Sequence, residues 1–145
     1  MMFNFKRLHK LAELPVRANP SDSGVDIRAC CENWITIHPG EFKSIPTGWA
    51  VQVPVGFEVQ VRPRSGLAAK YGVTVLNAPG TIDCSYRGEI FVILINHGPD
   101  VFDVHHGDRI AQLVVADVYL PRPVEVSELS VTHRGTDGLG STGVK

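Results

Sequence analysis

Side chains that could bind phosphate or do acid-base chemistry gather in five short segments of this chain. In the first, Asp26 follows a glycine at the start of a predicted strand, where it can close a turn or act as a metal-site carboxylate. In the second, Arg64, Ser65 and Gly66 stand at the start of the one predicted helix. Free N–H groups, a hydroxyl and a guanidinium can bind an anion there, but a capped helix with a solvated arginine uses the same groups.

The third segment, residues 77–90, reads as two strand-like pieces around a tight bend. Exposed backbone edges of such a hairpin can bind a flat heterocycle, and Tyr86 offers a platform the size of a ring. Asp83 is the natural general base, because an aspartate carboxylate is ionised at neutral pH and can accept a proton from water. Both residues could instead be ordinary turn residues, and only the other segments argue against that interpretation.

The fourth segment places Gln112 inside an otherwise apolar strand. A buried amide must find hydrogen-bond partners or it costs roughly 1 to 3 kcal/mol, so Gln112 either bonds a neighbouring backbone or faces a ligand. We expect Asp108 and Arg109 to form a structural ion pair. His105 and His106 are expected to be solvated loop residues, because adjacent side chains in a strand point to opposite faces.

The fifth segment is a glycine-rich tail at residues 134–143. Arg134 offers a bidentate guanidinium for phosphate, and the four glycines of the tail let the backbone wrap closely around an anion. The GxxxxGK[ST] pattern of a phosphate-binding loop is absent. We therefore expect residues 134–145 to form a flexible C-terminal arm that is mobile alone and ordered on substrate.

The elements that must position these segments are mainly strands. Residues 57–62 alternate apolar and polar side chains, with Phe57, Val59 and Val61 predicted on the buried face. The same period is repeated just before them by Trp49, Val51, Val53 and Val55. Residues 90–95 are apolar at both odd and even positions, so both faces of this strand are apolar. We therefore expect it to be covered on both faces, by a second sheet or by another subunit.

After residues 90–95 we expect a pair of strands joined by the turn at residues 104–109. The pair is expected to run through residues 110–120. Short clusters of turn-forming residues separate the strands, and only residues 65–71 look helical, with Ser65 as the predicted N-cap and Gly72 placed to end the helix. The pattern predicts an all-β fold, an antiparallel sandwich or barrel, as a single domain over residues 1–145.

Composition excludes several classes of function. The net charge of -1 gives the chain no global field to attract nucleic acid, so phosphate must meet a local cluster of donors. The cysteines, Cys30, Cys31 and Cys84, have neither CxxC spacing nor a partnering histidine pattern, which favours a reduced, cytoplasmic compartment over a zinc site or disulfide framework. Charges interrupt residues 1–14, and no stretch approaches the ~20 apolar residues of a membrane span, so neither a signal peptide nor a membrane partner is predicted.

Taken in order, the five segments resemble the trimeric dUTPase family from about Leu14 to Gly143. The matching stretches include Arg-Ser-Gly-Leu-Ala, Gly-Thr-Ile-Asp-x-x-Tyr-Arg-Gly-Glu-Ile, Gly-Asp-Arg-Ile-Ala-Gln-Leu and Arg-Gly-x-x-Gly-x-Gly-Ser-Thr-Gly. The resemblance implies a jelly-roll-like homotrimer with each active site built from three chains. It also implies Mg²⁺-dependent hydrolysis of dUTP to dUMP and pyrophosphate, which would limit uracil in DNA and supply dUMP for dTMP synthesis.

The resemblance assigns roles at the nucleoside end of the substrate. Asp83 would activate the water that attacks the α-phosphorus in line. Tyr86 would pack under the deoxyribose and leave no space for a 2'-hydroxyl. Uracil would be read by one side-chain amide and by backbone groups, namely those of Asn77 and of Thr81, Ile82 and Phe91.

At the phosphate end, the resemblance implies that four residues hold phosphate oxygens: Arg64, Ser65, Gly66 and Gln112. Asp26 would position Mg²⁺ through its water shell, while the ion itself would bind the triphosphate. Arg134 and a loop from a neighbouring subunit would close over the substrate, the loop being Gly138, Leu139, Gly140, Ser141 and Thr142. Closing such a lid excludes water and strengthens each charged contact, and product release requires it to open again.

Two positions depart from the family pattern. Position 139 is Leu, where the family commonly has a Phe that stacks over the uracil ring, so the stacking contribution of roughly 1 to 3 kcal/mol would be reduced. Position 85 is Ser, where many members have a second Asp beyond the base. Because Asp83 is retained, we interpret Ser85 as tolerated variation.

Three other functions remain to be weighed. A dCTP deaminase shares this fold, but its catalytic glutamate should fall near Ile93, and residues 90–95 carry no carboxylate. A nucleotide-binding regulatory protein of this fold would lack the general base or the lid of the enzyme, whereas Asp83, Tyr86 and Arg134 are all present here. A capsid-like structural jelly roll would not explain polar residues in five separate places.

Overall fold

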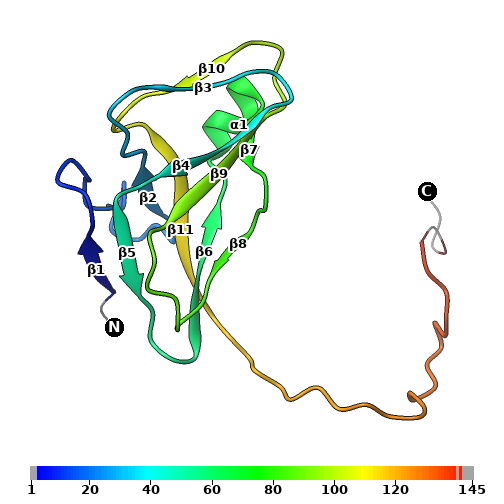
Figure 1. The fold of residues 1–145 in the computed structure, drawn as a ribbon. Helices are drawn as coiled ribbons and strands as arrows, with labels where there is room; N and C mark the ends of the chain where they lie inside the picture. The colour runs from blue at the N-terminus through cyan, green and yellow to red at the C-terminus, as the bar shows by residue number, and fades with distance from the viewer. Residues whose placement is uncertain (1–2, 140, 142–145) are drawn as a thin grey trace.

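The computed structural model describes residues 3–139 and 141, which fold into antiparallel β sheets and one short helix (Figure 1). The larger sheet has four strands in the order β2 (Val25–Arg28), β11 (Arg109–Asp117), β6 (Phe57–Arg62) and β8 (Gly80–Ile82). A second sheet has three strands in the order β4 (Phe42–Pro46), β9 (Phe91–Asn96) and β7 (Val73–Val75).

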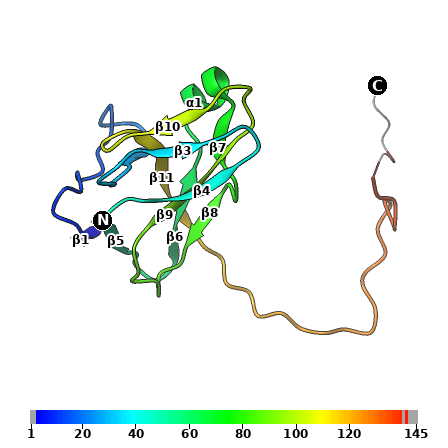
Figure 2. The same cartoon turned by 45° about the horizontal axis from the view of Figure 1, so that its top comes forward.

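Two small sheets complete the body of the molecule, as the turned view in Figure 2 also shows. One pairs β1 (Asn4–Arg7) with β5 (Trp49–Gln52), and the other pairs β3 (Ile35–Ile37) with β10 (Phe102–Val104). Every strand pair is antiparallel. The predicted all-β antiparallel fold with one short helix is therefore confirmed.

The main apolar core lies between the two larger sheets, and a smaller cluster is formed by Ala12, Cys30 and Trp49. Aliphatic side chains from both sheets fill the main core, among them Ile27, Val59, Val92, Leu94 and Leu113. Burial of branched aliphatic side chains stabilises the fold by roughly 1.5 to 3 kcal/mol for each one.

The strand at residues 57–62 has the predicted bounds, and Val59 and Val61 are buried while Phe57 is half-buried. The prediction of alternation in the preceding segment, residues 49–55, is wrong at its last residue. Val55 is 84% exposed, because it lies in a turn in which the Phe57 N–H donates to the Pro54 carbonyl. The period-2 pattern of residues 49–55 therefore ends at Val53, which is buried.

Strand β9 buries one of its two apolar faces within this chain. Val92, Leu94 and Asn96 are fully buried, whereas Phe91 is half exposed and the rest of that face is only partly covered. The face between the sheets is the covered one. Coverage of the opposite face by another subunit stays a prediction.

Two predicted strand pairings are wrong. Strands β10 and β11 do not pair with one another, since β10 pairs with β3 while β11 pairs with β2 and β6. Strands β8 and β9 do not form a hairpin either, because β8 pairs with β6 and β9 pairs with β4 and β7. The residues between β8 and β9 instead carry the chain from one sheet to the other.

The helix α1 spans Ser65–Tyr71, as predicted, but Ser65 is not its N-cap. Arg64 is the N-cap, with extended backbone and no side-chain capping bond. Gly72 ends the helix in the left-handed conformation, with φ of 67°, and its N–H donates to the Ala68 carbonyl at 3.1 Å. The helix thus sits directly after β6 and carries residues 64–66 at its start.

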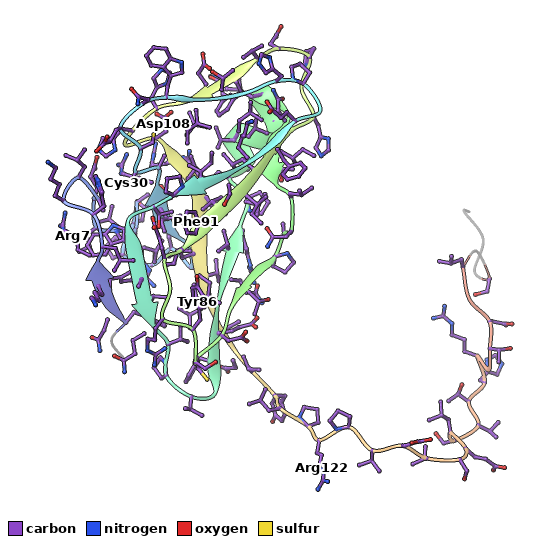
Figure 3. The ribbon with its side chains drawn as sticks, viewed as in Figure 1. Arg7, Cys30, Tyr86, Phe91, Asp108 and Arg122 are labelled. Carbon is purple, nitrogen blue, oxygen red and sulfur yellow. The ribbon has the colours of Figure 1, made fainter. Side chains whose placement is uncertain are left out.

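The described residues beyond Val118 leave the body of the molecule and extend away from it (Figures 1 and 2). Every described residue from Tyr119 onward is exposed. Figure 3 labels Arg122 on this tail, far from Tyr86 and Phe91 on the body. Within the described part of the chain, no helix has the length and apolar character to cross a membrane.

Candidate active site

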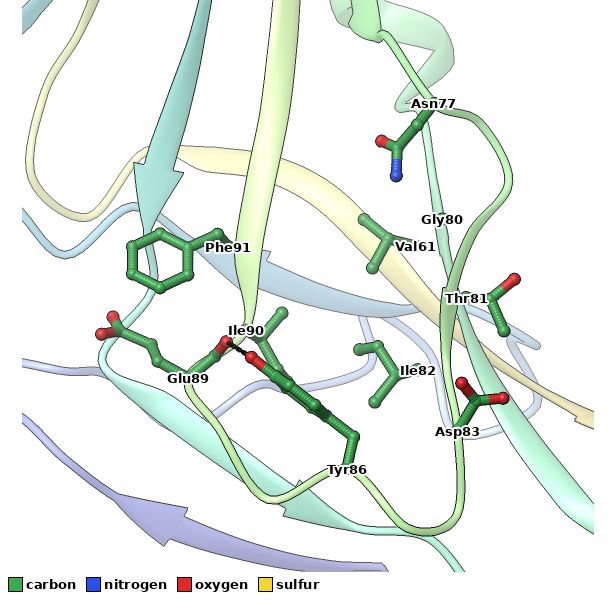
Figure 4. Close-up of a pocket in the computed structure, with 10 residues that line it drawn as sticks. All are labelled: Val61, Asn77, Gly80, Thr81, Ile82, Asp83, Tyr86, Glu89, Ile90 and Phe91. Atoms are coloured by element: carbon green, nitrogen blue, oxygen red, sulfur yellow. Dashed lines mark hydrogen bonds between the residues drawn. The ribbon is translucent and has the colours of Figure 1, made fainter.

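A cavity of about 200 Å³ opens where β8 and β9 diverge toward their separate sheets (Figure 4). Its walls are formed by Val61, Asn77, Gly80, Thr81, Ile82, Asp83, Tyr86, Glu89, Ile90 and Phe91. Six residues predicted for the site are among them: Asn77, Thr81, Ile82, Asp83, Tyr86 and Phe91. The structure therefore brings together the residues expected at the nucleoside and catalytic end.

One wall of the cavity is built by β8 and the residues before it. Gly80 and Ile82 are buried while Thr81 is exposed, as expected for alternating side chains of a strand. A Cβ at Gly80 would lie 3.2 Å from Asn77 Nδ2 and 3.2 Å from Val61 Cβ. Glycine at this position thus lets the Asn77 amide approach the strand, and Figure 4 shows that amide directed toward the cavity.

Asp83 follows β8 at the rim of the cavity, with an exposed side chain (Figure 4). Its backbone is held in place, because its carbonyl accepts the Tyr86 N–H at 3.1 Å. Among the described residues, no hydrogen bond or ion pair engages the Asp83 carboxylate. An ionised carboxylate in this setting can accept a proton from a water molecule.

Tyr86 crosses the opposite side of the cavity (Figure 4). Its hydroxyl donates to the Glu89 carbonyl at 2.8 Å, and its side chain remains 44% exposed. Arg87 Nη1 closes the loop by donating to the carbonyls of Cys84 and Tyr86, both at 2.7 Å. The ring is thus fixed at its far end and accessible on its surface.

A second polar cluster forms around Asp26, in which two guanidinium groups share one carboxylate. Arg64 Nε lies 3.4 Å from Asp26 Oδ1, and Arg109 Nη1 donates to Asp26 Oδ2 at 3.1 Å. Arg64 Nη1 also donates to the Arg109 carbonyl at 2.9 Å. Since the Asp26 side chain is only 17% exposed, this cluster is partly shielded from water.

The predicted ion pair between Asp108 and Arg109 is wrong. Arg109 pairs with Asp26, while Asp108 Oδ2 accepts the His105 N–H at 2.8 Å and lies 3.8 Å from His105 Nδ1. Arg109 is the first residue of β11 and Asp108 belongs to the preceding turn, so the two side chains separate. His105 is an exposed turn residue, as predicted.

Gln112 adopts the first of its two predicted alternatives. Its Nε2 donates to the Pro63 carbonyl at 2.9 Å, which ties β11 to the residue before Arg64. A Cβ built on Gly24 would collide with Gln112 Oε1. The glycine before Asp26 thus leaves room for this amide.

A third group of predicted residues lies on the extended tail. Arg134 Nε donates to the Asp137 carbonyl at 3.0 Å, and Gly138, Leu139 and Ser141 are exposed. Gly140 and Thr142, also predicted for this loop, lie outside the described residues. Neither the described residues of the tail nor the five residues Asp26, Arg64, Ser65, Gly66 and Gln112 contribute to the walls of the cavity that contains Asp83. One chain therefore holds the predicted site in three separate parts.

The residues around Asp26 fit an indirect contact with a metal ion. Among the residues that the structure describes, no group of three or more His, Cys, Asp or Glu side chains could hold a metal by itself. Both Asp26 oxygens face guanidinium groups, yet a carboxylate so paired can still accept hydrogen bonds from metal-bound water. This donor set suits an ion whose main ligands come from the substrate.

The three cysteines are free in the structure. Burial raises the pKa of the Cys30 thiol, and the nearby Glu89 and Cys31 raise it further. Burial also raises the pKa of Cys31, with a smaller contribution from Asp108. Neither thiol is therefore poised as a thiolate nucleophile at neutral pH.

Glu89 is a site residue that the sequence analysis missed. It lines the cavity, and its Oε1 accepts backbone N–H groups of Thr47 and Gly48. The only available signal was its place in the Tyr-Arg-Gly-Glu-Ile stretch, since the residues it binds lie more than 40 positions earlier.

Comparisons with known proteins identify the family of the chain. The dUTPase family model matches residues 10–143. The deoxyuridine 5'-triphosphate nucleotidohydrolase of Desulfotalea psychrophila is 54% identical over 131 residues, which cover 90% of this chain and 87% of that protein. The protein of the same name from Syntrophotalea carbinolica is 51% identical over 138 residues, covering 95% of this chain and 94% of that protein.

Solved structures give the same result. A mutant of the Staphylococcus bacteriophage 80alpha dUTPase, solved with dUpNHpp, matches this structure with a TM-score of 0.88 at 27% sequence identity, covering 99% of each chain. The family model extends over most of the chain, and the two bacterial relatives are about half identical to it. On these grounds the chain belongs to the dUTPase family, whose members are nucleotide hydrolases.

Proposed function

We propose that this chain hydrolyses dUTP to dUMP and pyrophosphate, with Asp83 as the general base. The observation that carries the proposal is the cavity of about 200 Å³, which gathers the Asp83 carboxylate, the Asn77 amide and the Tyr86 ring. Family membership supports it, since the two bacterial relatives are named deoxyuridine 5'-triphosphate nucleotidohydrolase and the phage 80alpha enzyme was solved with dUpNHpp.

The base end of the substrate is recognised at the free edge of β8. This strand is the last of its sheet, so one side pairs with β6 and the other side has backbone N–H and C=O groups to offer a ligand. Backbone groups of Thr81, Ile82 and Phe91 and the amide of Asn77 read uracil. The Tyr86 ring packs under the sugar and excludes a 2'-hydroxyl.

Hydrolysis begins when Asp83 takes a proton from a water molecule, which then attacks the α-phosphorus in line and displaces pyrophosphate. General base assistance contributes roughly 10²- to 10⁴-fold. The rest of the acceleration comes from holding the water and the triphosphate in line and from neutralising phosphate charge, as in other phosphoryl transfers.

Neutralisation of the phosphates falls to residues outside the Asp83 cavity. Arg64, Ser65, Gly66 and Gln112 hold phosphate oxygens, and Arg134 approaches with the glycine-rich loop as a lid. Because one chain holds these groups apart from Asp83, we propose a homotrimer in which three chains complete each site.

Magnesium is the proposed cofactor. Bound to the triphosphate, Mg²⁺ would neutralise charge and polarise the phosphoryl oxygens. Asp26 would hold the ion through its water shell, beside the guanidinium groups of Arg64 and Arg109. The same activity would keep uracil out of DNA and supply dUMP for dTMP synthesis, and the free cysteines favour a cytoplasmic location.

A substrate panel tests the proposed activity. The purified protein is incubated with dUTP, UTP, dTTP or dCTP in the presence of Mg²⁺, and pyrophosphate and ammonia are measured. We expect pyrophosphate from dUTP alone. Ammonia release from dCTP would instead assign the chain to the deaminases that share this fold.

A further inference from the structure

The Tyr86 ring is held by contacts that do not involve the substrate. Its hydroxyl donates to the Glu89 carbonyl at 2.8 Å, the bond drawn in Figure 4. A Cβ at Gly88 would collide with the Tyr86 hydroxyl and would lie 2.6 Å from Cζ, so the far end of the ring rests against the Gly88 backbone. The position of the ring therefore follows the position of residues 88 and 89.

Residues 89 and 90 are in turn fastened to the turn between β4 and β5. Glu89 Oε1 accepts the Thr47 N–H at 3.2 Å and the Gly48 N–H at 2.7 Å. The Thr47 hydroxyl donates to the Ile90 carbonyl at 2.6 Å, and the Ile90 N–H donates to the Trp49 carbonyl at 2.8 Å. These bonds join the edge of the cavity to the core of the molecule.

The turn itself has little freedom to move. Thr47 is 1% exposed, and Gly48 has a positive φ of 72°. A Cβ at Gly48 would lie 2.7 Å from Ala12 Cβ and 3.1 Å from Cys30 Sγ, so the turn packs tightly against residues that precede and follow β2. Glu89 thus transmits the position of a rigid turn to a partly exposed aromatic ring.

We propose that Glu89 is a positioning residue for sugar selectivity, acting through Tyr86. The inference rests on the proposed function. Exclusion of a 2'-hydroxyl by an aromatic ring is a steric effect, and such effects require the excluding group to be held within about 0.5 Å. A Tyr86 ring without its anchor at Glu89 would move aside and admit a ribonucleotide.

The test compares kcat/KM for dUTP and for UTP, with Mg²⁺, in the full-length protein and its variants. Glu89→Ala removes the acceptor of both N–H groups, and we expect the dUTP/UTP ratio to fall by about tenfold. Glu89→Gln keeps an Oε1 that can accept both bonds, and its ratio should stay within about twofold of the wild type. Glu32→Ala, at an exposed glutamate outside the cavity, is the matched control and should leave the ratio unchanged.

Tyr86→Phe provides a second test that does not disturb the core, because Tyr86 is 44% exposed and loses only its hydroxyl. Its ratio should also fall, and it decides the question if thermal denaturation shows that Glu89→Ala does not fold. Equal losses for both substrates, or an unchanged ratio in folded Glu89→Ala or Tyr86→Phe, would overturn the positioning role. Failure of the proposed function itself is distinguishable, because the wild type would then release no pyrophosphate from dUTP.

Discussion

At the scale of single residues, Asp83 combines a fixed backbone with an exposed carboxylate. The Asp83→Asn substitution keeps the size of the side chain and removes its ability to accept a proton. We expect kcat for dUTP to fall by roughly 10²- to 10⁴-fold with little change in KM. Steady-state pyrophosphate release measures both constants, with Asp117→Asn, exposed at the end of β11, as a matched control. Intact turnover in Asp83→Asn would contradict the proposed mechanism.

Leu139 gives a second prediction at this scale. Its side chain is fully exposed on the tail, at the position where the sequence resemblance implies a stacking Phe. An aromatic ring over a base contributes roughly 1 to 3 kcal/mol, so Leu139→Phe should lower KM for dUTP by about fivefold or more. Steady-state kinetics on the two proteins provide the measurement. A KM that is unchanged or higher in the substituted protein would count against a base-capping role.

The sequence was most informative about residues whose chemistry depends on their own type. Asp83, Asn77 and Tyr86 were predicted for one site and lie around one cavity. Glu89 was missed because its role depends on backbone groups of the distant turn at residues 47–48. The predicted ion-pair partner of Arg109 was wrong for the same reason, because Arg109 pairs with the distant Asp26 rather than with its neighbour Asp108.

At the scale of elements, Gly72 determines how α1 ends. Its φ is 67°, and a Cβ there would lie 2.6 Å from the Gly98 N. Gly72→Ala should therefore destabilise the protein by roughly 1 to 2 kcal/mol for the left-handed backbone, plus a further cost for the backbone clash. Gly40→Ala is the matched control, because Gly40 has a φ of 79° but nothing within 4 Å of its Cβ position.

Urea unfolding of both glycine variants gives the comparison. Gly72→Ala should show the lower unfolding midpoint, and the difference from Gly40→Ala measures the contact with Gly98. Equal midpoints would mean that the backbone around Gly98 moves away from the added methyl group without loss of stability.

Local patterns predicted elements better than they predicted pairings. The bounds of β6 and α1 follow from alternation and from helix-ending glycine, which act over a few residues. The pairing of β8 with β6, and of β10 with β3, joins segments far apart in the chain, so no short window contains it. The apolar run at residues 90–95 likewise predicted a buried strand, but it could not show which face of that strand the chain itself would cover.

At the scale of the whole molecule, the three separate parts of the proposed site predict complementation between inactive subunits. Asp83→Asn removes the base from the cavity, and Arg134→Ala removes a guanidinium from the tail. If the cavity and the tail of one site come from different chains, a mixed trimer contains some sites with both groups intact. Random mixing of equal amounts should restore about a quarter of wild-type activity.

The experiment requires subunit exchange, by coexpression or by joint refolding, with native mass spectrometry to verify mixed trimers. Each variant carried through the same procedure alone is the control and should stay inactive. Mixed trimers without recovered activity would show that a single chain supplies both groups.

The position of β8 at the end of its sheet also bears on solubility. An unpaired strand edge can template strands from other molecules, and this hazard grows with the length of the edge. Strand β8 has only three residues, Gly80–Ile82, and begins at a glycine. Such a short edge offers few backbone groups to a strand of another molecule, which limits the hazard at this edge. If β8 recognises uracil as proposed, this edge can therefore stay open to the ligand with little risk of pairing with a strand of another molecule.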